Sequence, residues 1–206
     1  MRRWEDEDFA KRSASLTFAA MTAPHYLAGK LLLAMPGMSD PRFARAVVAM
    51  AAHDEQGALG VGIGQLVPKM SFRDLLDNVG IDPGVAPDAP VHMGGPVEPH
   101  RGFLLHSPEW SAPGMMALNP VFGLTASLEA LREIAAWRGP RHWLFALGYA
   151  GWGAGQLDGE MQRHGWFAGV ASAAVVFETP AETRWTAVWR AAGIDPAMLA
   201  STSGRA

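Results

Sequence analysis

The stretch Leu147–Glu160, LGYAGWGAGQLDGE, constrains the fold more than any other, because five of its fourteen residues are glycine. It directly follows the apolar residues WLFA and precedes a helix-like segment. Glycine adopts positive φ readily and permits close approach of another backbone. The pattern therefore predicts a strand, a glycine loop and the start of a helix, with Gly151, Gly153 and Gly155 using that freedom.

The composition limits the classes of function. Hydrophobic residues make up 49% of the 206 residues and charged residues 18%, which suits a globular chain with a sizeable core. The net charge of −3 and the scarcity of lysine argue against a duplex-binding surface, which usually carries a basic excess. The chain has no cysteine, which excludes disulfides, thiol nucleophiles and thiolate metal sites.

The chain contains no apolar run near the ~20 residues that cross a bilayer, and no signal-peptide core. We therefore expect a cytoplasmic protein with no membrane partner and no direct nucleic-acid partner. Residues 1–24, which include the acidic run Glu5–Asp8, are expected to form an N-terminal extension. Residues 25–206 are expected to form a single domain.

Apolar runs and turn signals predict the main elements. Leu31–Met35 is a short continuous apolar run and predicts a buried strand. Paired runs at 46–63 and 166–177 predict neighbouring antiparallel strands, the first pair joined by a turn at Asp54–Gly57. Helices are predicted at segments with helical apolar spacing and capping signals, namely Ser71–Gly80, Thr125–Trp137, Gly155–His164 and a last helix opening at Thr179. Strands in pairs and single helices favour an α+β fold.

Four blocks occur in order between about residues 26 and 200: GKLLLAMP with DPRF, HDEQGALG, GGPV with RGFLLH, and LGYAGWGAGQLDGE. Together they resemble the YqgE/AlgH family of bacterial proteins. The resemblance implies a single α+β domain whose mostly antiparallel sheets fold into a pseudo-barrel flanked by helices. It also implies a cytosolic protein. The family is often labelled a transcriptional regulator, but no DNA-binding motif accompanies that label here, and the resemblance supplies no catalytic residues.

The glycine-rich stretch has two interpretations. Its GxGxG spacing before a helix could offer backbone N–H groups to an anion, with Gly151, Gly153, Gly155 and Gln156 as the binding residues. The favoured interpretation is tight packing of Trp152 over a glycine surface, in which case Trp152 is buried. In that case we also expect Gly153 to need its positive φ or close contacts.

Two histidines are the best polar candidates for a ligand-binding site. His53 and His106 each end an apolar run within a family block. No standard nucleophile motif and no metal-ligand spacing such as HExxH is present, so we expect no metal and no cofactor. The sequence favours a non-enzymatic regulatory or interaction module with an unidentified protein or small-molecule partner. The alternative is an anion or small-molecule binder, or an enzyme, that uses Gly151–Gly155 with His53 or His106.

Overall fold

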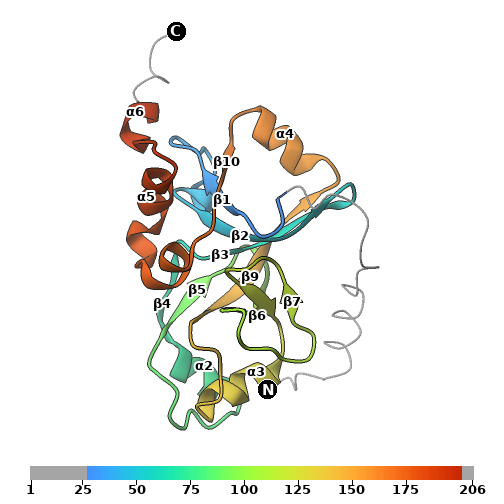
Figure 1. The fold of residues 1–206 in the computed structure, drawn as a ribbon, viewed down its shortest axis with the longest axis vertical. Helices are drawn as coiled ribbons and strands as arrows, with labels where there is room; N and C mark the ends of the chain where they lie inside the picture. The colour runs from blue at the N-terminus through green and yellow to red at the C-terminus, as the bar shows by residue number, and fades with distance from the viewer. Residues whose placement is uncertain (1–26, 201–206) are drawn as a thin grey trace.

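The computed structural model describes residues 27–200, so the predicted extension at residues 1–24 lies outside the described part. Ten strands form one curled sheet in the order β10-β1-β2-β3-β9-β6-β8-β7, with β5 also paired to β9 and β4 paired to β5 (Figure 1). The strands are β1 (Leu31–Ala34), β2 (Val47–Asp54), β3 (Gly57–Gly62), β4 (Leu66–Ser71), β5 (Pro90–Met93), β6 (Val97–His106), β7 (Met116–Ala117), β8 (Gly123–Thr125), β9 (Trp143–Gly153) and β10 (Trp166–Gly169). All strand pairings are antiparallel except β5–β9, so the predicted α+β fold with a largely antiparallel sheet is confirmed.

Helices cover the curled sheet from several sides (Figure 1). They are α2 (Phe72–Asn78), α3 (Leu128–Ala135), α4 (Gln156–Gln162), α5 (Ala181–Ala191) and α6 (Pro196–Ala200), with a 3-10 turn η1 (Pro41–Phe43) and a π-helical turn η2 (Ala174–Glu178). In the view of Figure 1, α2 and α3 lie together at one end of the sheet, and α4 lies at the other. None of the helices in residues 27–200 has the length and apolar character to cross a bilayer.

Strand β1 shows why the predicted apolar run is apolar at every position. Leu31 and Leu33 belong to the inner core, which α5 closes with Trp185 and Trp189. The alternate residues of β1 belong instead to the outer cluster beneath α4. Successive side chains of a strand point to opposite faces. A strand between two apolar layers must therefore be apolar throughout, and all four residues of β1 are fully buried.

A separate cluster covers the other half of the sheet. Phe72 and Leu76 of α2 and Ile134 of α3 pack with Leu104 of β6 and Phe145 of β9. Helix α2 begins where the sequence predicts, because the Ser71 hydroxyl and the Asp74 carboxylate form a reciprocal capping box. Each helix is short, so its stability depends on this apolar face more than on its own propensity.

The second apolar run of the 166–177 pair is not a strand. Residues 166–169 form β10, which pairs with β1, whereas Ala174–Glu178 form the π-helical turn η2. Arg184 of α5 explains the difference, because its buried guanidinium donates to the carbonyl groups of Val175 and Thr179. A neighbouring strand would compete with Arg184 for the carbonyl of Val175. The expected strand at 173–177 is therefore wrong.

Arg184 also ties α5 to the sheet. Its guanidinium donates to the carbonyl oxygen of Ile63 and lies 3.3 Å from Nε2 of His92 in β5. Burial lowers the pKa of Arg184 to about 10. Burial, and next the nearby Arg184 cation, lower the pKa of His92 to about 4. The imidazole is therefore neutral near pH 7 and can accept from the guanidinium.

Strand β9 organises the sheet because it changes partners halfway along. Up to Leu147 it lies between β5 and β6, and from Ala150 it pairs with β3. At the change, Gly62, Gly94, Gly95 and Gly148 lie so close that a Cβ on any of them would come within 3.0 Å of a neighbouring backbone atom. We call these four residues the glycine crossing. It lets three chain segments meet where side chains would keep them apart.

The glycine crossing yields a stability prediction with a matched control. Gly148 and Gly80 both have φ of +74°, but a Cβ at Gly148 would clash with backbone, whereas a Cβ at Gly80 meets nothing within 4 Å. Gly80→Ala should lower the free energy of unfolding by about 1–2 kcal/mol, because a non-glycine residue is disfavoured in the left-handed conformation. Gly148→Ala should cost at least about 3 kcal/mol, because overpacking adds to that penalty. Urea denaturation measures both, and equal losses would contradict a packing role for Gly148.

Candidate functional site

The glycine-rich stretch is mostly strand rather than loop. Strand β9 continues to Gly153, and Gly151 and Gly153 pair with Leu59 and Gly57 of β3. Positive φ occurs at Gly155 (+66°) but not at Gly151 or Gly153, so the prediction for those two residues is wrong. A Cβ at Gly153 would meet only the Gln156 side chain, at 3.9 Å, so close contact does not require glycine there. Pairing with β3 holds this segment extended.

Trp152 is buried, as the packing interpretation predicts, with 7% of its surface exposed. Its indole N–H donates to Oε2 of Glu160 at 3.0 Å, and the indole N–H of Trp166 donates to the same oxygen at 2.8 Å. Gln156 donates to the other oxygen of Glu160 at 2.9 Å and accepts from the backbone N–H of Gly153 at 3.0 Å. The carboxylate of Glu160 thus accepts hydrogen bonds from the side chains of Trp152, Gln156 and Trp166.

His53 lies beside the same helix. It is almost fully buried at the end of β2, and its Nε2 is 3.5 Å from Oδ2 of Asp158 in α4. Of the predicted site residues, the structure therefore brings His53 together with the segment that contains Trp152 and Gln156. In residues 27–200, no group of three His, Asp or Glu side chains could hold a metal ion.

His106 lies elsewhere. It pairs with Trp143 at the opposite end of β9, roughly 30 Å along the strand from Trp152. Its Nδ1 donates to the carbonyl oxygen of Ser107 at 3.0 Å, which leaves Nε2 to accept from the Thr125 hydroxyl at 3.0 Å. Burial lowers the pKa of His106, so the neutral ring is favoured. His106 and His53 do not share one site.

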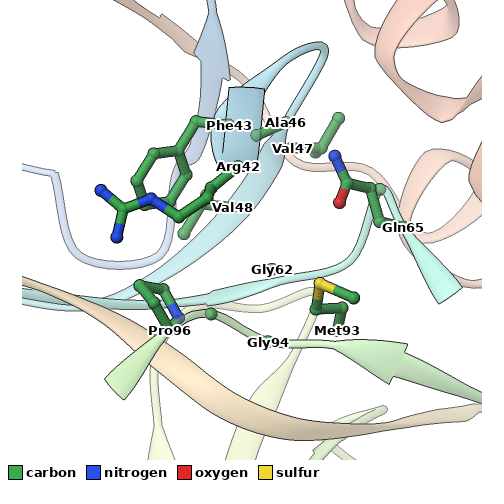
Figure 2. Close-up of a pocket in the computed structure, with 12 residues that line it drawn as sticks. Arg42, Phe43, Ala46, Val47, Val48, Gly62, Gln65, Met93, Gly94 and Pro96 are labelled. Atoms are coloured by element: carbon green, nitrogen blue, oxygen red, sulfur yellow. The ribbon is translucent and has the colours of Figure 1, made fainter. Parts of the chain in front are cut away.

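A hollow that the sequence did not predict lies beside the glycine crossing. Its volume is about 130 Å³, and Figure 2 shows Arg42 and Phe43 on one side facing Met93 and Pro96 on the other. The rest of its wall is formed by three residues of the glycine crossing, by apolar side chains around the start of β2, and by the two residues before β4, namely Gly62, Gly94, Gly95, Ala46, Val47, Val48, Gly64 and Gln65. We call this space the crossing hollow.

Most polar groups around the crossing hollow already have partners within the chain. Arg42 forms an ion pair with Asp40 at 2.6 Å, and the Gln65 amide donates to the carbonyl of Ala44 at 3.1 Å. The carbonyl of Gly94 accepts from the N–H of Gly62 at 2.7 Å. The surface that remains is mainly apolar, and Met93 at its rim is 43% exposed.

Sequence reasoning missed this hollow although a signal was present. The spacing Gly60-x-Gly62-x-Gly64 is typical of a strand that another backbone approaches closely. The structure shows such an approach at Gly62, where an added Cβ would lie 2.6 Å from the carbonyl oxygen of Met93. Pairing between the two segments is long-range, so neither segment alone indicates that they meet.

Comparisons with known proteins agree on one family. The family described as AlgH-like (DUF179) matches residues 31–197. A UPF0301 protein of Novosphingobium aromaticivorans is 55% identical over 90% of this chain and 100% of its own length. A UPF0301 protein of Rhizorhabdus wittichii is 53% identical with the same coverage.

Solved structures show the same fold. The solution structure of the AlgH protein from Pseudomonas aeruginosa superposes with a TM-score of 0.71 and 34% identity, covering 91% of this chain and 100% of that chain. A crystal structure from Corynebacterium diphtheriae, 22% identical, gives a TM-score of 0.68 over 92% of this chain and 97% of that one, and supports the fold alone. The chain belongs to the AlgH-like family.

The cluster around Glu160 yields a second stability prediction. Trp152→Ala should lower the free energy of unfolding by about 3–5 kcal/mol, because it empties a buried aromatic site. Trp152→Phe should cost about 1–3 kcal/mol, because it keeps a ring but removes the N–H bond to the Glu160 carboxylate. Trp137→Ala is the control, since Trp137 is 74% exposed, and should cost less than about 1 kcal/mol. In a urea series, a loss below about 1 kcal/mol for Trp152→Ala would refute the packing role.

Proposed function

We propose that the protein is a non-catalytic interaction module of the cytoplasm, and that the crossing hollow receives one apolar side chain of a protein partner. The size and lining of the hollow carry this proposal. Pockets for whole small-molecule ligands usually measure about 300–1,000 Å³. The crossing hollow, at about 130 Å³, is closer to the engineered ~150 Å³ apolar cavity that binds benzene.

The chemistry around the crossing hollow supports docking over catalysis. Among the described residues that line it, Arg42 alone is ionisable, and it is paired with Asp40. General acid–base or nucleophilic chemistry needs a side chain that can exchange a proton or attack. A partner side chain needs only a shaped apolar wall, which Phe43, Val47 and Met93 supply.

The alternative, an anion or substrate site at Gly151–Gly155 with His53 or His106, has less support. Glu160 already accepts from Trp152 and Gln156 at that segment. A second anion there would face the charge of that carboxylate. His53 and His106 lie too far apart to contribute to one site.

If the module regulates transcription, we propose that it acts through a protein partner. The net charge of −3 gives little electrostatic affinity for phosphates. We expect no specific binding to duplex DNA at physiological salt. Titration of labelled promoter fragments against scrambled competitors tests this expectation. Nanomolar binding with at least about tenfold preference for one sequence would overturn it.

The docking proposal predicts a saturable response to an apolar side-chain probe. N-acetyl-leucine-methylamide should shift the backbone amide signals of Gly64, Gly94 and Gly95 in ¹⁵N NMR spectra, because these residues line the hollow. The glycine analogue of the probe should leave them unchanged, since it has no side chain to bury.

Two matched variants sharpen the same experiment. Met93→Glu places a charge at the rim and should abolish the response, because burying an unpaired charge is costly. Val85 is 61% exposed and does not line the crossing hollow, so Val85→Glu should leave the response intact. If the shifts do not saturate at about 50 mM probe, the affinity is too weak for a docking contact, and the proposal is contradicted.

A further inference from the structure

A second, larger hollow lies between the turn after β1 and the helices α5 and α6, and Ala44 and Arg45 also line it. Its volume is about 580 Å³, within the usual range for small-molecule pockets. Met35 and Met38 form an apolar part of its wall, while Arg45 and Arg190 bring two guanidinium groups. We call it the arginine hollow, and it is separate from the crossing hollow.

Neither arginine has an ion-pair partner in the part of the chain that the structure describes. Within residues 27–200, no carboxylate lies within 4.0 Å of Arg45 or Arg190, whereas Arg42, Arg132 and Arg138 each pair with one. The chain as a whole is acidic, with a net charge of −3. The two cations therefore give this concave site a positive charge although the net charge of the chain is negative. Such a site attracts anions more strongly than a flat surface with the same charges.

The side chain of Arg45 is exposed, but it lies against an aromatic ring. Its guanidinium carbon lies 5.1 Å from the centre of the Trp185 ring, a cation–π contact. Trp185 is itself fixed, because it is buried and its indole N–H donates to the carbonyl of Ala34 at 2.8 Å. Arg45 also has φ of +55°, a conformation that is rare outside glycine and is concentrated at functional sites.

The remaining polar groups define the charge that the site can accept. Asp195 is the one acidic residue among those lining the arginine hollow, and its Oδ1 accepts from the N–H of Ala197 at 3.0 Å. Two arginines and one aspartate leave a local charge of about +1. Thr186 adds a hydroxyl that can donate to an oxygen or accept from a hydroxyl.

We propose that the arginine hollow binds a small molecule with an oxyanion, either carboxylate or phosphate, next to an apolar group. The oxyanion would accept hydrogen bonds from Arg45 and Arg190, whose planar forks suit two-oxygen acceptors. The apolar group would lie against Met35 and Met38, since flexible thioethers adapt to varied shapes. This site does not depend on the docking role proposed for the crossing hollow.

A competing explanation for Arg190 is helix stabilisation. It lies in the last turn of α5, where a cation interacts favourably with the helix dipole. That role would change thermal stability but not ligand affinity. Affinity measurements therefore separate the two roles.

The test is a titration of the folded chain with three aromatic probes, followed by ¹⁵N NMR at the Arg45 amide and the Trp185 indole. Benzoate and phenyl phosphate carry the two oxyanions, and benzamide is the uncharged control. We expect saturable shifts with at least one oxyanion and none with benzamide. The oxyanion that binds more tightly identifies the class of ligand. Affinity should also fall as salt is raised, because ionic contacts are screened.

Substitutions assign the effect to residues. Arg45→Gln and Arg190→Gln should each raise the Kd at least about tenfold, the effect of losing one charged hydrogen bond. Arg163→Gln changes an exposed arginine directly after α4 and should leave the Kd within about twofold. The proposal is overturned by no saturation at about 10 mM of either oxyanion, by equal affinity for benzamide, or by unchanged Kd in both variants. Arg45 and Arg190 are both exposed, so we expect both variants to fold, and urea denaturation of each checks this.

Discussion

The glycine crossing is the constraint on which the rest of the structure depends. Gly62, Gly94 and Gly148 bring three chain segments to distances that side chains would prevent. Backbone hydrogen bonds join them, from Gly62 to Gly94 and from Gly94 to Leu147. Because β9 leaves β5 and joins β3 at this point, the sheet curls and encloses an inner core, which α5 then closes. The crossing therefore determines the fold and also forms the floor of the crossing hollow.

The two hollows follow from the same arrangement. The chain between β1 and β2, residues 35–46, is not part of a strand and contains the 3-10 turn η1. Arg42, Phe43 and Ala46 of this segment line the crossing hollow, and Ala44 and Arg45 line the arginine hollow. Neither hollow needs a specialised loop, because both are gaps between elements that the fold already fixes. Different ligands are therefore proposed for them on the basis of size and charge.

Much of the fold could be predicted from local sequence, because local patterns decide it. The apolar run of β1, the capping box at Ser71 and the helical spacing of Trp185 and Trp189 each correspond to what the structure shows. Errors arose where distant contacts decide the outcome. Pairing with β3 holds Gly151 extended, and the Arg184 guanidinium donates to the carbonyl of Val175, within the expected strand at 173–177, and to that of Thr179 just after it.

The candidate sites were less predictable for the same reason. His53 and His106 looked equivalent in sequence, yet they lie near opposite ends of β9. His106 belongs to β6, which pairs with the first half of β9, whereas His53 in β2 is next to β3, which pairs with the second half. The residues of both hollows come from segments far apart in the chain, such as Phe43 with Pro96, and Arg45 with Arg190. A short sequence motif cannot predict a pocket whose wall is formed by such distant segments.

Native-state hydrogen exchange at the glycine crossing tests the central claim most directly. The amide protons of Gly62 and Gly94 donate across the crossing, at 2.7 and 2.8 Å. If the crossing holds the fold together, both should exchange only through global unfolding, with the free energy and urea dependence of complete denaturation. Exchange of these two amides through a local, urea-independent opening, while the amides of β1 stay protected, would contradict the account.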